Sequence, residues 1–370
     1  MWLKQLGVEN CRLIDKWQLQ LSPLSNLIIG GNATGKSSLL EALSILSSGR
    51  SFRTPRIREV IRHGCEQLTV TGKIHDNELQ SDYPVGISKT AQGTRIRINH
   101  ADVHQQAELS SHLPLTIIHP ETISVLTGAP GQRRAMLDWV AFYRNKDFHQ
   151  DWKNHQRILK QRNSCLRDPQ QRYALPHWTE QFIRLQPRIY RFRQDALAAI
   201  TAQLDNDSVQ TLFQDHGQLM LKLYSGFPAA IDPTDTGQLK SFFAARQAQE
   251  IDQGMTLYGC HRGDLNVLMD VLPVAQFASR GQLKIFGIAL LLAQSQAITT
   301  GDKKRGIIAI DDLASELDSN NQALLYQVLG QTRQQLVITA TKMPDQAFLP
   351  DQSKVFHVER GQVSELTTTE

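Results

Sequence analysis

Hydrophobic and polar positions alternate near the start of the chain and then give way to a short apolar run. The segment 19–31 reads LQLSPLSNLIIGG, so three consecutive apolar residues precede two glycines. In the segment 37–46, SSLLEALSIL, the leucines recur at helical spacing. This pattern predicts a buried strand, a glycine-rich loop and a helix in that order.

Short alternating runs dominate the segment 66–100. The runs QLTVTGKI, YPVGIS and TRIRIN are separated by turn-forming residues, which predicts antiparallel strands. The apolar segment 113–121, LPLTIIHPE, predicts a further buried strand that ends at a proline.

Apolar residues recur at helical spacing between 131 and 166, which predicts helices there. His155 and Arg162 interrupt the apolar seam, so we expect helices that pack on each other within a lobe rather than a long free coiled coil. The seam itself contains Phe148, Trp152, Leu159 and Leu166. Breaks in the helical region are predicted at three prolines, Pro169, Pro176 and Pro187.

The chain is predicted to stay mostly helical to about 250, with a loop at 224–238. After about 280 the pattern predicts a buried helix and two buried strands. The segment 282–298 is a strongly apolar predicted helix. The segments 305–318 and 334–342 each contain a buried strand, with a helix between them. This order predicts an α/β fold whose sheet is split by a large, mostly helical insertion.

Composition is that of an ordinary globular protein, with 370 residues, 41% of them hydrophobic and 21% charged. This length predicts two or three domains. No apolar run approaches the roughly 18 residues that cross a bilayer, and the charged N-terminal segment does not resemble a signal peptide. The four cysteines are far apart and lack metal-ligand spacing. We therefore expect a cytoplasmic protein with reduced thiols and no membrane partner.

Charge is distributed unevenly, although the net charge is only +4. The segment 131–193 contains 14 Lys and Arg residues but five acidic residues, a local charge of +9. Such a segment is either a solvated helical surface or a nucleic-acid contact. The same two interpretations hold for an arginine run that follows the first helix: Arg50, Arg53, Arg56, Arg58 and Arg62.

A phosphate-binding loop is predicted between the first buried strand and the first helix. Residues 30–37, GGNATGKS, fit the pattern G-x4-G-K-[ST]. Its backbone N–H groups would converge on a phosphate, Lys36 would reach the β- and γ-phosphates, and Ser37 would ligate Mg²⁺. The predicted nucleotide contacts are Gly30, Gly31, Asn32, Ala33, Thr34, Gly35, Lys36, Ser37 and Ser38.

Two acidic residues end the apolar strand in the segment 305–318. Asp311 is expected at the edge of the sheet, where it would hold Mg²⁺ with Ser37, and Asp312 would polarise an attacking water. Acidic residues after buried strands are common, so this prediction depends on the phosphate loop. About 275 residues separate Lys36 from Asp311, which is too many for a small kinase.

A serine and a glutamine open the predicted helix at 282–298. The residues Ser279, Arg280, Gly281 and Gln282 offer a hydroxyl group and backbone N–H groups at the positive end of a helix. In isolation this is an ordinary helix N-cap.

Together, these three motifs resemble the ABC-type ATPase heads. Four stretches in order along the chain are similar to the RecF family, the bacterial recombination-repair ATPases related to structural-maintenance-of-chromosomes heads: GGNATGKSSLLEALSILSSGRSFRT, GAPGQRRAMLDW, ASRGQLK and IDDLASELD. The resemblance implies an ABC-type P-loop head with an antiparallel β region and an inserted helical lobe. It implies head halves at 1–128 and 271–370, with the basic lobe at 129–270 between them.

The resemblance also implies how a nucleotide site is completed. ATP and Mg²⁺ would be held by one copy of the chain, and the signature at 279–282 would belong to a second, facing copy in an ATP-dependent homodimer. Ser315 and Asp318 look like the loop that crosses such an interface. Arg12 matches an arginine that approaches the phosphates in such heads, although it could equally be an exposed strand-end arginine.

Several residues depart from the pattern of these heads. Ala33 and Thr34 replace a usual glycine and serine, and we expect Ala33 to be tolerated only with a negative φ. Asp312 replaces the usual glutamate, and Arg280 replaces the first glycine of the general signature. The segment 339–342, TATK, lacks the switch histidine. His119 or Glu121 would occupy the position of the usual glutamine.

By resemblance, the expected function is that of an ATP-gated clamp on duplex, gapped or junction DNA. It would act in recombinational repair and replication maintenance, with weak ATP hydrolysis, the partners RecO and RecR, loading of RecA and a role in the SOS response. The residues predicted to contact DNA are Arg50, Arg53, Arg56, Arg133, Arg134, Lys160 and Arg162.

Two other classes share the phosphate loop. An ABC transporter ATPase subunit has the same motifs but usually brings them closer together along the chain, and it has no evident use for the basic insertion. A small-molecule P-loop kinase fits the loop but not the signature at 279–282.

Overall fold

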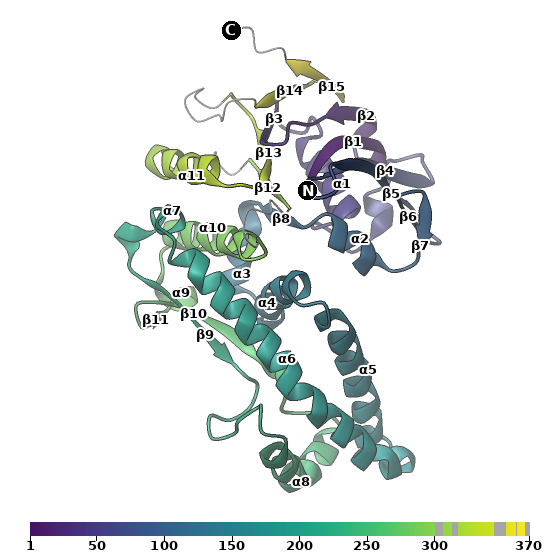
Figure 1. The fold of residues 1–370 in the computed structure, drawn as a ribbon, viewed down its shortest axis with the longest axis vertical. Coiled ribbons are helices and arrows are strands. Elements are labelled where there is room, and N and C mark those ends of the chain that lie inside the picture. Colours follow the sequence, from purple (N-terminus) through teal and green to yellow (C-terminus); the bar gives the residue numbers. More distant parts are fainter. Residues whose placement is uncertain (300–305, 313–316, 344–352, 360, 367–370) are drawn as a thin grey trace. The chain divides into compact units, whose positions relative to one another are not determined.

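The structure is a computed structural model that describes residues 1–299, 306–312, 317–343, 353–359 and 361–366 (Figure 1). The chain forms two compact units. The first contains Met1–Thr122, Asp207–Leu212 and Thr299–Glu370, and the second contains Ile123–Asn206 and Phe213–Ile298. Among the described residues, no helix has the length and apolar character required to cross a membrane.

One layer of the first unit is a six-stranded antiparallel sheet with the order β2-β1-β4-β5-β6-β7. Its inward residues alternate with outward polar residues, as the sequence predicts. Gly72 lies on the inner side, where an added Cβ would come within 2.8 Å of both Leu3 and Leu46. The strands are β1 (Trp2–Cys11), β2 (Ile14–Gln20), β4 (Gln67–Asp76), β5 (Ser81–Thr90), β6 (Thr94–Ile98) and β7 (Ala101–Val103).

The second layer is a six-stranded sheet with the order β15-β14-β3-β13-β12-β8. All neighbouring pairs are parallel except the edge pair β14–β15. The carboxyl ends of β3, β13, β12 and β8 therefore meet at one edge, where α/β sheets bind ligands. The strands are β3 (Ser25–Gly30), β8 (Leu115–Ile118), β12 (Ile307–Asp311), β13 (Gln335–Ala340), β14 (Lys354–Glu359) and β15 (Gln362–Leu366).

Helix α1 (Lys36–Ser48) is buried with both sheets in one hydrophobic core. Leu39, Leu40, Leu43 and Leu46 are each at most 1% exposed, which fixes the helix that begins at the phosphate loop. The other helices of this unit are α2 (Gln106–His112), α7 (Asp207–Gln210) and α11 (Ser319–Gln331).

The second unit is mostly helical (Figure 1). Its helices are α3 (Ser124–Thr127), α4 (Pro130–Arg144), α5 (Phe148–Arg167), α6 (Leu175–Leu204), α8 (Thr236–Gln253), α9 (Val274–Phe277) and α10 (Arg280–Gln296). It also contains a three-stranded sheet of β9 (Leu219–Tyr224), β10 (Asp264–Met269) and β11 (Leu272–Pro273). The predicted α/β head with an antiparallel region and an inserted helical lobe is confirmed. The functional division at 1–128, 129–270 and 271–370 stays a prediction, and α10 packs in the second unit.

Two details of the helical unit differ from expectation. On α5, Trp152 of the predicted apolar seam is 36% exposed, whereas His155 and Arg162, expected to interrupt the seam, are 2% and 1% exposed. The buried face therefore includes two polar side chains: Arg162 is hydrogen-bonded, whereas the Nε2 atom of His155 has no hydrogen-bond partner among the described residues. Pro187 does not break its helix: α6 continues on both sides of it, although the proline nitrogen cannot donate a hydrogen bond.

Candidate functional site

The phosphate loop connects β3 to α1, and the side chain of Lys36, the first residue of α1, folds back onto the loop. The Lys36 Nζ donates to the carbonyl oxygens of Gly30 and Gly31, each at 2.7 Å. Burial lowers the pKa of Lys36, while the nearby carboxylates of Asp312 and Asp311 raise it. The ammonium group is thus held beside the loop, close to the position that its sequence pattern assigns to a phosphate.

Two glycines of the loop are required by close contacts. Gly30 approaches the backbone of β14, and an added Cβ would lie 2.4 Å from the Val358 carbonyl oxygen. Gly35 has φ 114°, and its Cβ would lie 3.2 Å from the ring of Trp17. Trp17 on β2 is 2% exposed and donates through Nε1 to the Gly361 carbonyl at 2.8 Å. This buried tryptophan therefore packs against Gly35 of the loop.

The tip of the loop has an unexpected conformation. Ala33 has φ 59°, so the expectation of a negative φ is wrong. The residue is exposed, and the turn at this point needs the left-handed region, which costs a non-glycine residue roughly 1–2 kcal/mol. Next to it, the Thr34 hydroxyl donates to the Gly31 carbonyl at 2.9 Å, which closes the turn.

Ser37 and Asp311 meet at the edge of the parallel sheet, although 274 positions separate them. The Ser37 hydroxyl donates to Asp311 Oδ1 at 2.9 Å. A serine hydroxyl and a carboxylate are oxygen ligands of the kind that Mg²⁺ accepts, so the pair fits this ion. Their roles as metal ligands, and that of Lys36 in catalysis, stay predictions.

Thr339 on β13 is a member of the site that sequence reasoning missed. Its hydroxyl donates to Asp311 Oδ1 at 2.9 Å, and the side chain is 1% exposed. The parallel register pairs Asp311 with Thr339, because both strands end at the same edge. A polar residue beside the carboxyl end of an apolar strand, next to the strand that ends in Asp311, was the signal that could have found it.

The backbone turns sharply directly after Asp311. Asp312 has φ 44°, and its N–H donates to the Thr339 carbonyl and hydroxyl oxygens at 3.2 and 3.1 Å. Because the Asp312 carboxylate raises the pKa of Lys36, it lies within electrostatic reach of the phosphate loop. Its catalytic role remains a prediction.

His119 follows β8 at the same edge. Burial lowers the pKa of His119, while Glu121 and Asp311 raise it. Its ring centroid lies 5.3 Å from that of Phe52. Glu121 is exposed, and its N–H donates to His119 Nδ1 at 3.3 Å. His119 thus interacts electrostatically with Asp311, and which of the two residues takes the position of the glutamine stays a prediction.

Arg12 is paired with a carboxylate rather than directed at open solvent. Its Nε and Nη2 donate to the two carboxylate oxygens of Glu41 at 2.8 and 3.0 Å. Glu41 lies on α1 and is fully buried, and this hydrogen bond raises the pKa of Arg12. To contact a phosphate as predicted, Arg12 would have to leave this pair, and that contact stays a prediction.

In the second unit, the predicted signature forms the N-terminus of α10. The Ser279 side chain accepts from the Gln282 N–H at 3.3 Å, and the Gln282 side chain accepts from the Ser279 N–H at 2.8 Å. This capping box holds Arg280 and Gly281 on the surface. Phe277, two residues before it, is 57% exposed. The segment is thus an ordered surface with an apolar residue beside it.

The residues predicted for the loop after the acidic pair Asp311 and Asp312 are only partly described. Ser315 lies outside the described residues. Asp318 is the N-cap of α11, and its side chain accepts from the Asn321 N–H at 2.9 Å. This structural role is compatible with an interface position, which remains a prediction.

Four predicted DNA contacts lie in the second unit, and one of them is wrong. Arg162 is buried and donates to Glu250, Thr256 and Thr179, so its guanidinium cannot reach DNA. Arg133 pairs with Asp264 at 2.8 Å.

The remaining candidates differ in their surroundings. In the second unit, Arg134 donates to the Gly263 carbonyl at 2.7 Å, which ties it to its own unit, and Lys160 is exposed. In the first unit, the side chains of Arg50, Arg53 and Arg56 are exposed. Three of the four candidates in the second unit are therefore bonded within the protein, whereas most of the other basic residues of the segment 131–193 are exposed.

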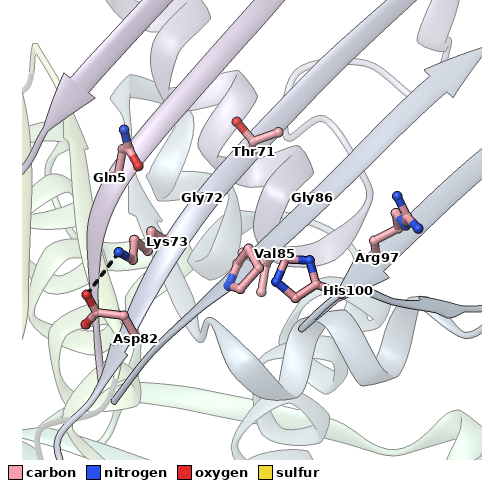
Figure 2. Close-up of a pocket in the computed structure, with 10 residues that line it drawn as sticks. Gln5, Thr71, Gly72, Lys73, Asp82, Val85, Gly86, Arg97 and His100 are labelled. Atoms are coloured by element: carbon pink, nitrogen blue, oxygen red, sulfur yellow. Dashed lines mark ion pairs between the residues drawn. The ribbon is translucent and has the colours of Figure 1, made fainter. Parts of the chain in front are cut away.

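The outer face of the antiparallel sheet carries a separate groove of about 580 Å³ (Figure 2). Lys73 and Arg97 line it together with Asp82, and Figure 2 shows the ion pair between Lys73 and Asp82. Lys4 and His75 also contact Asp82, and these hydrogen bonds lower the pKa of that carboxyl far below its ordinary value. Lys4, Lys73 and His75 therefore share one carboxylate partner.

Known proteins are similar to this chain along nearly its whole length. Residues 2–364 match the family described as the RecF/RecN/SMC N terminal domain. A Yersinia pestis protein named DNA replication and repair protein RecF is 35% identical over 367 residues, which cover 98% of both chains. A Shigella flexneri serotype 5b protein of the same name is 34% identical, covering 99% of this chain and 100% of its own length.

Solved structures agree with these relatives. A structure described as the recombination mediator protein RecF with ATP in the RecFOR pathway has a TM-score of 0.85 and 25% identity, covering 99% of this chain and 98% of that one. An Smc head domain from Pyrococcus furiosus has a TM-score of 0.61 and 13% identity, covering 99% of this chain and 96% of its own, which is a similarity of fold alone.

Proposed function

This chain belongs to the RecF family of DNA replication and repair proteins, and from this premise we propose that it is an ATP-gated DNA-binding protein of recombinational repair, with weak ATPase activity. The contact between the Ser37 hydroxyl and Asp311 Oδ1 carries this proposal. It joins the end of the phosphate loop to the acidic pair Asp311 and Asp312 at the edge of one sheet, as an ATP site requires.

The nucleotide would be held by the residues at this edge. The N–H groups of the phosphate loop and Lys36 would bind the phosphates of ATP, and Lys36 would exchange its contacts with the Gly30 and Gly31 carbonyls for phosphate oxygens. Ser37 and Asp311 would hold Mg²⁺, which supplies charge neutralisation for the phosphates when bound. Asp312 would accept a proton from the attacking water.

The second half of the site would come from another copy of the chain. Ser279 and Gly281 are exposed at the N-terminus of a helix, where anions bind favourably. The γ-phosphate would contact both copies, and ADP would lack this contact. Because only differential contacts shift an equilibrium, hydrolysis would open the dimer.

The cellular role is proposed from relatives alone. The structure with ATP is described as a mediator of the RecFOR pathway. We extend this role to the present chain: binding of duplex, gapped or junction DNA, partnership with RecO and RecR, loading of RecA and support of the SOS response. The transporter-subunit alternative is not favoured, because the relatives cited above are named as DNA replication and repair proteins.

Light scattering with ATP, ADP and a non-hydrolysable analogue tests the dimer. Ser279→Arg places a bulky cation at the proposed trans contact, and we expect it to retain ATP binding but lose ATP-dependent dimerisation. Ser241→Arg, the same substitution at an exposed position on α8, serves as the matched control. Dimerisation of the Ser279→Arg protein with ATP would exclude the shared site.

A further inference from the structure

Lys89 on β5 is a buried cation without a carboxylate partner. It is 9% exposed, and its Nζ donates to the Thr94 hydroxyl at 3.2 Å. Within the part of the chain that the structure describes, it forms no ion pair. Burying a charged group without an opposite charge is unfavourable, so a lysine in this position is best compensated by an anion.

The hollow beside Lys89 contains further cations. Its volume is about 570 Å³, and Arg50, Arg53 and Gln106 line it with Lys89. No acidic side chain lines it. Burial lowers the pKa of Lys89, and the positive charge of Arg50 lowers it further. Three cationic residues therefore line one space, an arrangement that an anion would stabilise.

The loop that carries the two arginines is held in place by hydrogen bonds. The Ser51 hydroxyl accepts from the N–H groups of Arg53 and Thr54 at 3.0 and 3.1 Å. The same hydroxyl donates to Glu41 on α1 at 2.5 Å. The Arg50 carbonyl accepts from the Ser44 hydroxyl of α1 at 2.8 Å. An ordered loop can present its charges without an additional entropic cost on binding.

The groove of Figure 2 is a useful comparison, because it lies on the same sheet and also contains cations. There, Lys73 lies 3.3 Å from Asp82, and Arg97 lies 3.0 Å from Asp102. Both cations therefore have a carboxylate partner that partly neutralises them, although Asp82 is shared with Lys4 and Asp102 with Arg95. The hollow beside Lys89 lacks this neutralisation.

We propose that the hollow formed by Lys89, Arg50 and Arg53 binds one phosphate of a DNA backbone. This inference rests on the proposed DNA-binding function and assigns to it a site in the first unit. A phosphate oxygen would accept hydrogen bonds from the ammonium and guanidinium groups, which form strong charge-assisted bonds. Such a contact contributes to affinity and positioning on any sequence and does not read bases.

The test measures the salt dependence of DNA binding by the full chain. Anisotropy of a labelled duplex is followed with ATP between about 50 and 200 mM salt. The variants are Lys89→Met, which keeps an apolar stem in the buried position, and Arg53→Gln, which changes an exposed side chain. Lys73→Met is the matched control from the neutralised groove.

We expect Lys89→Met and Arg53→Gln each to reduce the slope of log affinity against log salt by about 1, with ATP affinity retained. Lys73→Met should leave the slope unchanged. If the slope is unchanged in both Lys89→Met and Arg53→Gln while the wild type binds DNA normally, the proposed phosphate site is wrong and the proposed DNA binding still stands. Absence of DNA binding by the wild type would instead overturn the proposed function. If Lys89→Met fails to fold, Arg53→Gln decides the result.

A second measurement separates a DNA phosphate from a free one. Inorganic phosphate is added without DNA, and thermal unfolding of the wild type and of Lys89→Met is compared. Stabilisation that Lys89→Met abolishes, combined with unchanged DNA slopes, would assign the pocket to free phosphate and contradict our proposal. Reduced DNA slopes support it, whether or not inorganic phosphate also binds.

Discussion

Arg162 shows how a single residue can be mistaken for a surface contact. It lies in a run of basic residues, yet it donates to Glu250 at 2.5 Å with both side chains at most 1% exposed. Its guanidinium also lies 5.0 Å from the centre of the Phe243 ring. The sequence could not predict this burial, because Glu250 follows 88 residues later and the charge pattern alone favours solvent.

Removal of this arginine should destabilise the second unit. Arg162→Met would leave the Glu250 carboxylate buried without its ion-pair partner, and we expect a loss of about 3–5 kcal/mol in the free energy of unfolding. Urea denaturation measures this change. Lys160→Met, two residues away and exposed, should change stability by less than about 0.5 kcal/mol. A loss below about 1 kcal/mol for Arg162→Met would mean that the pair is dispensable.

Substitutions of Ala33 test the left-handed turn in the phosphate loop. With φ 59°, Ala33→Gly should keep or improve ATP affinity, since glycine adopts this region without a steric cost. Ala33→Val should weaken ATP binding by roughly tenfold, because a β-branched residue is strained there. Isothermal titration with ATP measures both. Equal affinities of the glycine and valine variants would argue against the left-handed turn in the nucleotide-bound loop.

At this scale, the sequence predicted the loop residues but not their conformations. Lys36, Ser37 and Asp311 could be chosen because the two motifs have strict patterns. The sign of φ at Ala33 was mispredicted, because the expectation considered only the preference of alanine and not the geometry of the turn. Thr339 was missed because its contact with Asp311 depends on strand register, which a single sequence does not display.

Among the elements, α5 has the most unusual buried face. His155 and His261 have ring centroids 6.2 Å apart, and each has a buried ring nitrogen without a hydrogen-bond partner. Burial lowers the pKa of His155 to about 3 and that of His261 to about 4. Positive charges nearby, such as Arg193 for His155 and Arg262 for His261, contribute to these lowered pKa values.

These depressed pKa values predict acid sensitivity of the second unit. Between about pH 6.5 and pH 4, the histidines of the unfolded chain bind protons while those of the folded chain do not. Stability should therefore fall as pH decreases through this window, by about 1.4 kcal/mol per pH unit for each histidine. Thermal unfolding at several pH values measures the slope. His155→Gln should reduce it, whereas the exposed His177 replaced by Gln should not.

The elements themselves were predicted where the periodicity was strong. The buried strands β3, β8, β12 and β13 and the helices α1, α4, α5 and α10 lie where the apolar pattern placed them. Strand β9 was missed, because it lies at the end of a long helical region and its burial pattern is weak. It is ordered by pairing with β10, more than 40 residues later in the chain.

At the level of the whole molecule, nucleotide binding should stabilise the fold. A ligand that binds the folded state at 100 times its Kd adds about 2.7 kcal/mol to the free energy of unfolding. We expect ATP with Mg²⁺ to raise the melting temperature of the wild type. Lys36→Met should abolish this shift, and Asp311→Asn should reduce it mainly when Mg²⁺ is present. An equal shift in the wild type and Lys36→Met would exclude the phosphate loop as the site.

The strand order has a consequence for synthesis on the ribosome. Strand β3 carries the phosphate loop, yet its two neighbours in the sheet are β13 and β14. The Asn26 side chain at the start of β3 donates to the Leu336 carbonyl oxygen of β13, which lies 310 residues later in the chain. At roughly 5–20 residues per second, β3 waits roughly 15–60 s for its first neighbour to be translated. We therefore expect β3 to keep two edges of unpaired backbone N–H and C=O groups, beside its apolar side chains, throughout most of translation. This makes the nascent chain a candidate client for chaperones that bind at the ribosomal exit tunnel.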